Sequence, residues 1–154
     1  MWIYISFLFL PIVFQFISNL NDKNLEYLSK HLFLIFAIFL IGSRYIIGGD
    51  WAQYNEYFNA SAESDLFVLL SLKGPSYAIL NHLVSVVGGS IVLVNLVSAF
   101  ILIYGLNKFC KDVPNYWDAY LISIPYLLIV VAMGYTRQSI AMGFVFLALS
   151  DLEF

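Results

Sequence analysis

The sequence predicts an all-α membrane protein, a polytopic transmembrane helical bundle with about five spans plus a re-entrant or interfacial helix. Of its residues, 62% are hydrophobic and 18% are aromatic, whereas only 11% are charged. Soluble domains carry roughly 25% charged residues, so this composition indicates a chain that lies in lipid. The 14 Phe and 11 Tyr side chains support the same class, because aromatic rings favour lipid-facing and interfacial positions.

Charge and cysteine content exclude several other classes. The net charge of −3 comes without any basic run, so nothing in the sequence suits a nucleic-acid backbone. The single cysteine, Cys110, allows neither an internal disulfide nor a CxxC site. No HxxH, DxD or HExxH motif occurs, and no glycine-rich phosphate loop. We therefore expect no metal, no cofactor and no nucleic-acid partner.

Five apolar segments have lengths close to the roughly 20 residues that a spanning helix needs. The first segment is uncharged and lacks the basic start and the cleavage site of a signal peptide, so we expect a retained span with a kink at Pro11. A long polar segment, 48–74, follows the second span and is expected outside the bilayer. The predicted spans are 2–20, 32–47, 91–106, 119–133 and 138–154.

The stretch 76–107 is uncharged throughout and would form a helix of about 48 Å at roughly 1.5 Å per residue, too long for one ordinary span. Gly88-Gly89-Ser90 is the expected break. Pro75 suits the first position of a helix, and the residues between it and the break are too few to cross alone. The sequence therefore predicts a re-entrant or interfacial helix at 76–87 and a separate span at 91–106.

The distribution of lysine predicts the orientation of the chain. Loops 21–31 and 108–118 carry two lysines each, whereas 48–74 carries four acidic residues and one lysine. Cytoplasmic loops hold the excess of basic residues, so we expect both lysine-bearing loops in the cytoplasm and 48–74 on the outer face of the membrane. Residues 1–154 form one predicted membrane domain. Its last helix ends at Phe154 without a clear cap, and we expect the chain to be truncated there.

Two arginines lie at the expected outer boundary of the bilayer. Arg44 ends an apolar run, and Arg137 stands alone among uncharged residues from 119 to 150, just after an expected break at 134–136. Ionisable groups at that depth usually face a protein interior, a partner or a water-filled cavity. Because a guanidinium is a planar fork suited to phosphate oxygens, we predict that both arginines bind substrate. The structural alternative is that each one snorkels or binds the last carbonyls of a helix.

A cluster of aromatic residues follows Asp50. Asp50, Tyr54, Tyr57 and Phe58 have the spacing i, i+4, i+7 and i+8, which places them on one face of a short helix. We predict Asp50 as the catalytic general base, Tyr54 as a hydrogen-bonding partner, and the flat Trp51 and Tyr57 rings as a sugar platform. The alternative makes Asp50 an N-cap and the rings an interfacial belt.

Three sequence blocks resemble the EpsG family of bacterial exopolysaccharide polymerases, relatives of the Wzy-type repeat-unit polymerases. In order along the chain, these blocks are the apolar run to Arg44 with Gly48-Gly49-Asp50-Trp51, Pro75-Ser-Tyr-Ala-Ile-Leu-Asn81, and Arg137-Gln-Ser-Ile-Ala-Met-Gly-Phe144. They match in order and spacing across about 32–150. The chain departs from the family at Lys73-Gly74, where members often have an acid before the proline. Members are also usually more than twice as long.

The resemblance implies transfer of a glycan from polyprenyl pyrophosphate to a sugar hydroxyl of a second lipid-linked unit, which builds exopolysaccharide, capsule or O-antigen. It implies that Gln138 joins the arginines in substrate binding. It also implies contacts with membrane lipid and with other polysaccharide export and chain-length proteins. Two alternatives remain open: a transporter or flippase of lipid-linked oligosaccharide, for which the sequence shows no inverted repeat, and an inert truncated membrane protein.

Overall fold

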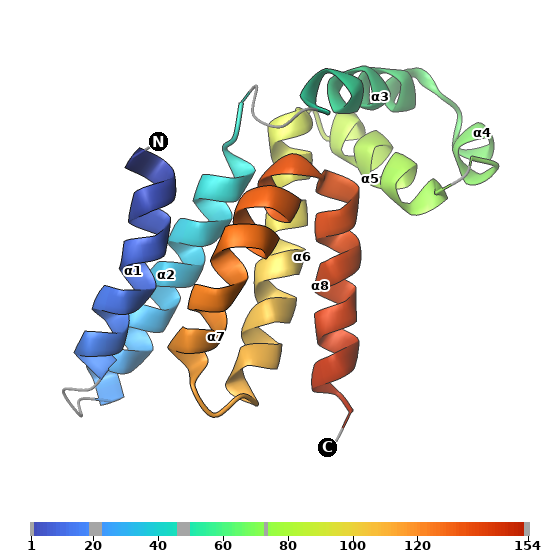
Figure 1. Cartoon of the computed structure of the whole chain (residues 1–154). Coiled ribbons are helices and arrows are strands. Elements are labelled where there is room, and N and C mark those ends of the chain that lie inside the picture. The colour runs from blue at the N-terminus through green and yellow to red at the C-terminus, as the bar shows by residue number, and fades with distance from the viewer. Residues whose placement is uncertain (1, 19–22, 46–49, 73, 153–154) are drawn as a thin grey trace.

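The computed structural model describes residues 2–18, 23–45, 50–72 and 74–152, and every regular element within them is a helix (Figure 1). The predicted all-α class is thus confirmed. In chain order, the elements are α1 (Trp2–Ser18), α2 (Lys23–Gly42), α3 (Trp51–Glu63), α4 (Leu66–Leu70), α5 (Pro75–Val86), α6 (Ile91–Lys111), α7 (Tyr116–Ser123), the π-helix η1 (Ile124–Ala132) and α8 (Thr136–Ser150). The predicted Gly48-Gly49 link and the ends of the first two predicted spans and of the last lie outside the described residues.

Helix α2 begins well before the predicted start at residue 32, so the prediction of a loop at 21–31 is largely wrong. A salt bridge of 2.6 Å between Lys30 and Glu26 supports this polar part of the helix, because residues four apart lie on the same face. The helix also ends earlier than predicted, at Gly42, which leaves Arg44 two residues beyond it. The apolar pattern alone did not show these limits.

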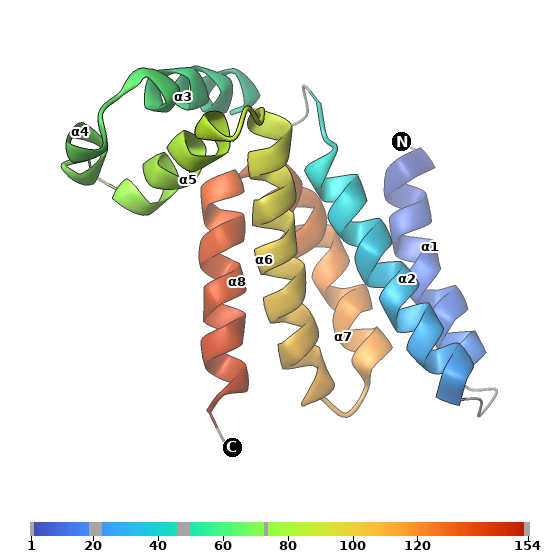
Figure 2. The same ribbon diagram turned by 180° about the vertical axis from the view of Figure 1, so that it is seen from behind.

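Helix α5 is separate from α6, as the break at Gly88-Gly89 predicted. Gly88 has a φ of +73°, a left-handed conformation that favours glycine. The N–H of Gly89 donates to the carbonyl of Val84 at 2.9 Å, which closes the end of α5. Figures 1 and 2 show that the two helices run in clearly different directions.

Among the described residues, two helices are long and apolar enough to cross a membrane, namely α2 and α6. The apolar stretches Phe7–Ser18 and Tyr116–Ala132 are shorter, and α8 has 15 residues. The structure therefore does not confirm about five spans. It shows a helical bundle with two clear candidate spans.

Five rod-like segments lie side by side in the bundle: α1, α2, α6, α7 with η1, and α8 (Figures 1 and 2). Large aromatic side chains fill the core between α1, α2 and α7. Phe33 meets Tyr120 edge to face with ring centroids 5.0 Å apart, and Trp117 packs on Phe33 at 5.7 Å. Helices α3, α4 and α5 form an arm that extends sideways from one end of the bundle.

The α6–α8 contact depends on two glycines. A Cβ atom on Gly105 of α6 would lie 2.2 Å from the carbonyl oxygen of Gly143 on α8. A Cβ atom on Gly143 would lie 2.7 Å from the carbonyl oxygen of Ile101. Helices in membranes often approach through such small residues, because close van der Waals packing drives their association. The middle of α8 is therefore held tightly against α6.

We predict that Gly105→Ala separates α6 from α8 and lowers the free energy of unfolding by about 1–3 kcal/mol, the usual cost of overpacking. Thermal unfolding in detergent would measure the loss as a lower Tm. Gly134→Ala is the matched control, because an added Cβ there meets no atom within 4 Å. Equal Tm values for the two variants would contradict the proposed close packing.

Candidate functional site

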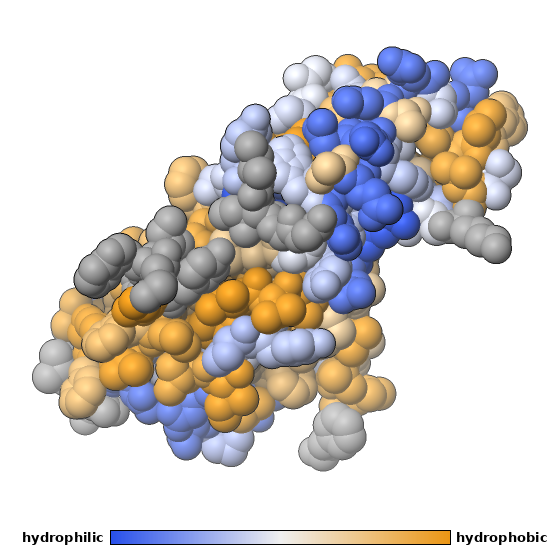
Figure 3. Space-filling view, turned by 45° about the horizontal axis from the view of Figure 1, so that its top comes forward, coloured by the Kyte–Doolittle hydropathy of each residue, from blue (hydrophilic) through white to orange (hydrophobic). Residues whose placement is uncertain are grey.

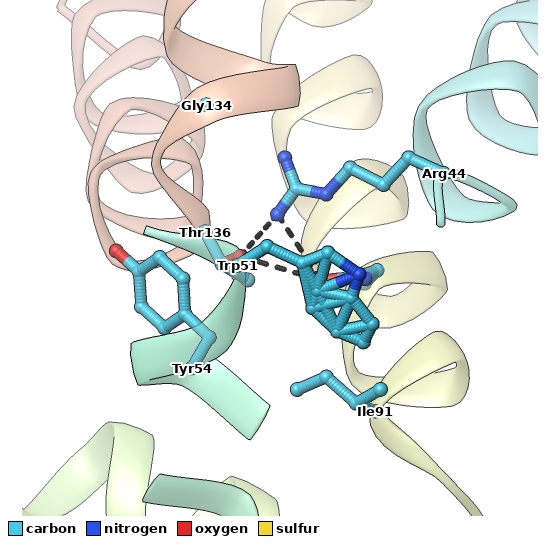
Figure 4. Close-up of a pocket in the computed structure, with 7 residues that line it drawn as sticks. Arg44, Trp51, Tyr54, Ile91, Gly134 and Thr136 are labelled. Atoms are coloured by element: carbon cyan, nitrogen blue, oxygen red, sulfur yellow. Dashed lines mark hydrogen bonds between the residues drawn. The ribbon is translucent and has the colours of Figure 1, made fainter. Parts of the chain in front are cut away.

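Arg44 is buried, with 8% of its surface exposed, and its guanidinium ties together distant parts of the chain. It donates hydrogen bonds to the carbonyl oxygen of Ala132, to Oγ1 of Thr136 and, at 3.1 Å, to Oδ1 of Asn95 (Figure 4). Thr136 also donates to Oδ1 of Asn95 at 3.3 Å. The end of α2, the first part of α6 and the junction between η1 and α8 therefore meet at one side chain.

All the acceptors around Arg44 are neutral. Within the described part of the chain, no Asp or Glu forms an ion pair with it. The carbonyl of Ala132 belongs to the last turn of η1, where a helix leaves its acceptors without partners. These contacts match the structural alternative, in which Arg44 binds the last carbonyls of a helix, whereas substrate binding by Arg44 stays a prediction.

Arg137 is exposed and lies in the first turn of α8, directly after Thr136. The central carbon of its guanidinium lies 4.3 Å from the ring centroid of Tyr57 and 5.0 Å from that of Tyr77. These two rings stack with their centroids 5.7 Å apart. Cation–π contacts of this kind hold a cation without using its N–H groups. Among the described residues, Arg137 has neither an acidic partner nor a side-chain hydrogen bond, so its donors are free for an anion.

Tyr54 of α3 lies between the two arginines. Its ring meets Tyr77 edge to face at 5.8 Å. Burial raises the pKa of the Tyr54 hydroxyl above its ordinary value. The group therefore stays protonated at neutral pH and can donate a hydrogen bond to a ligand, in keeping with its predicted role.

Two cavities lie at the start of α8. The smaller has a volume of about 10 Å³, room for about one water molecule. It is lined by Arg44, Trp51, Tyr54, Ile91, Asn95, Gly134 and Thr136, most of them labelled in Figure 4. The larger is a groove of about 560 Å³ between α5, α6 and α8. Its lining is largely apolar, with Leu80, Ile101 and Phe144, and Arg137 is its one charged residue among those described.

Asp50 occupies the N-cap position of α3, but its side chain makes no capping hydrogen bond. The carboxylate is half-buried and lines neither of the two cavities. The hydrogen bond expected from an N-cap aspartate is therefore not formed. The role of Asp50 as general base stays a prediction.

The two rings of the predicted sugar platform, Trp51 and Tyr57, have different neighbours in the structure. Trp51 lines the small cavity and meets Tyr45 edge to face at 5.4 Å. Its indole N–H is buried and has no hydrogen-bond partner among the described residues. Tyr57 instead contacts Arg137 and Tyr77. Of the two rings, Trp51 is the one that lines a cavity.

No cavity lined by the described residues brings Arg44, Asp50 and Arg137 together: Arg44 lines the small cavity and Arg137 lines the larger groove. Their convergence on one site stays a prediction. Gln138 lies apart, in a third groove between η1 and α8 with Tyr126 and Phe146 among its lining residues.

The sequence reasoning did not identify Asn95, Thr136 or Tyr77 as site residues. For Asn95 a signal existed, since its amide is an isolated polar group within the apolar run 91–97. Tyr77 also had a signal, because it lies in the second block that resembles the family, whereas Thr136 had none.

The EpsG family matches the sequence over residues 27–153, which include both arginines and the aromatic residues around them. The chain belongs to the EpsG family. No curated protein and no solved structure matches it. The family and the two apolar helices indicate a membrane protein with a role related to polysaccharide biosynthesis.

For this EpsG-family chain we predict that Arg44→Lys lowers the free energy of unfolding by about 1–3 kcal/mol, because one ammonium cannot reach all three acceptors and leaves buried groups unpaired. Thermal unfolding in detergent would measure the change. Arg137→Lys is the control and should shift the free energy by less than about 0.5 kcal/mol, since the side chain is exposed. An Arg44→Lys protein as stable as the parent would show that the hydrogen bonds of Arg44 do not hold the helices together.

Proposed function

We propose that this chain polymerises repeat units of exopolysaccharide, capsule or O-antigen in the bacterial inner membrane. In this proposal it transfers a glycan from polyprenyl pyrophosphate to an acceptor sugar hydroxyl. One observation carries the proposal: Arg137 is held by two tyrosine rings, lines a large apolar groove, and makes no side-chain hydrogen bond within the described part of the chain.

The groove and the arginine together suit the two parts of a lipid-linked pyrophosphate. The apolar walls from Leu80, Ile101 and Phe144 would contact the polyprenyl chain. The guanidinium would bind the phosphate oxygens in a bidentate manner, and such charge-assisted hydrogen bonds are roughly twice as strong as neutral ones. A cation at this position would also stabilise the negative charge that develops on the pyrophosphate as it leaves.

In the transfer step, the acceptor hydroxyl oxygen attacks the anomeric carbon, the bond from that carbon to the pyrophosphate breaks, and the hydroxyl proton moves to a base. Asp50 is our candidate for this base, and general base catalysis typically contributes 10²–10⁴-fold in rate. Tyr54 would donate a hydrogen bond to a sugar hydroxyl from the adjacent face of α3, where it lines the small cavity. Substrate would then lie across the first turn of α3, between Asp50 and the groove.

The proposed topology has five spans, formed by α1, α2, α6, α7 with η1, and α8. The arm of α3, α4 and α5 would lie on the outer face, with chain-length and export proteins as possible neighbours of this face. The lysines of 21–31 and 108–118 support this orientation, since both segments lie at the end of the bundle opposite the arm (Figure 1).

Cysteine labelling of intact cells tests the topology. In a Cys110→Ser background, we expect Glu56→Cys on the exposed surface of α3 to react with a membrane-impermeant maleimide, and Lys23→Cys to react only after lysis. Both positions are exposed, whereas Ser29 and Ser61 are buried and would report poorly. Labelling of Lys23→Cys in intact cells would reverse the proposed orientation.

Two conservative variants test the catalytic proposal in cells that depend on the protein for polymer. Arg137→Lys keeps the charge but loses the guanidinium fork, and Asp50→Asn keeps size and much of the N-capping ability. We expect each to cut polymer formation at least tenfold, as seen on a gel, while single lipid-linked repeats accumulate on the outer leaflet. Gln53→Ala, an exposed position on the same helix as the aromatic residues, is the control.

Normal polymer in both variants, at normal protein levels, would contradict the proposed site. Accumulation of the repeats on the inner leaflet would instead indicate a flippase, because the defect would then precede polymerisation.

A further inference from the structure

The far end of the arm exposes an unusual amount of apolar surface. Helix α4 and the turn after it expose Leu66, Phe67, Val68, Leu70 and Leu72, and Phe67 is 88% exposed. Leu69 alone is buried within this helix and attaches it to the rest of the arm. Figure 3 shows apolar side chains at this end of the arm, next to the polar surface of α3.

The position of α4 relative to the bundle indicates which medium surrounds it. Figures 1 and 2 show the arm passing beyond the start of α8 and bending downward, so that α4 lies about level with the start of α8. If α8 enters the membrane at its start, α4 lies beside the bundle at the boundary of the outer leaflet. The polar helix α3 lies above α4 and α5 in Figure 1, on the proposed water side.

The distribution of the exposed side chains around α4 favours lipid over a protein partner. At about 100° per residue, Leu66, Phe67, Val68 and Leu70 cover roughly 200° of the helix circumference. A helix that packs on protein typically presents a narrower apolar stripe, and the opposite side is polar. Lipid chains can surround a helix on every side that its own protein leaves open. Exposed Asp65 and Ser71 flank the apolar residues and can stay among the headgroups.

We propose that α4 and Leu72 insert into the outer leaflet of the bilayer and hold the arm against the membrane surface. The inference requires that the bundle spans a membrane, but it does not depend on the polymerase activity. It revises the expectation that all of 48–74 lies outside the bilayer. Its consequence is that α3 and α5 stay fixed over the start of α8, where Tyr57 and Tyr77 contact Arg137.

An environment-sensitive fluorophore on α4 tests the proposal. The full chain, with Cys110→Ser and Phe67→Cys, would be labelled with NBD and reconstituted in vesicles of phosphatidylcholine and phosphatidylglycerol. We expect blue-shifted emission and at least twofold quenching by phospholipids that carry a doxyl group near the glycerol. Phe67 is so exposed that its replacement should leave the fold intact. Glu56→Cys, labelled in the same way on α3, is the matched control and should show emission typical of water.

Two results would overturn the inference. Quenching of the Phe67→Cys probe by iodide but not by doxyl lipid would place α4 in water. A blue-shifted probe that neither agent quenches would show that protein, such as a second copy of the chain, covers α4. Neither result would bear on the polymer assay, so this inference and the proposed function can fail separately.

Discussion

The hydrogen bonds of the buried Arg44 guanidinium are the interaction on which the candidate site depends. They connect the end of α2 with Asn95 of α6 and with Ala132 and Thr136, on either side of the break before α8. Because the donors of a guanidinium are fixed in one plane, these acceptors must keep a fixed relative position. Thr136 directly precedes Arg137, so the same hydrogen bonds determine where the free cation stands.

The two arginines show different solutions to the cost of a cation near lipid. Arg44 is surrounded by neutral oxygen acceptors, which satisfy its donors and leave little for a ligand. Arg137 rests on the faces of Tyr57 and Tyr77, which favour its charge but leave its N–H groups available. The difference explains why we assign a structural role to the first arginine and the phosphate-binding role to the second. The close α6–α8 packing at Gly105 and Gly143 keeps both arrangements in place.

Several structural features were predictable because their causes are local. The break between α5 and α6 follows from two glycines, and the start of α8 follows from Gly134 and its neighbours. The π-helix η1 was not predictable, because its wide turns depend on how Pro125 and the residues around it pack against other helices. The early start of α2 was missed because the prediction followed the apolar residues, which begin at residue 32. The pairing of Glu26 with Lys30, which supports the polar first turns of the helix, was not considered.

The sequence by itself determined the helical class, the membrane character, the breaks between helices and the presence of two arginines at helix ends. All of these depend on composition or on residues close together in the chain. The tertiary structure decided which arginine forms side-chain hydrogen bonds among the described residues and which does not. The partners of Arg44 are 51, 88 and 92 positions away in the chain, and whether they face it depends on the rotation and packing of whole helices. Helical periodicity fixes the spacing of side chains along one helix, but only packing fixes the direction in which each helix face points.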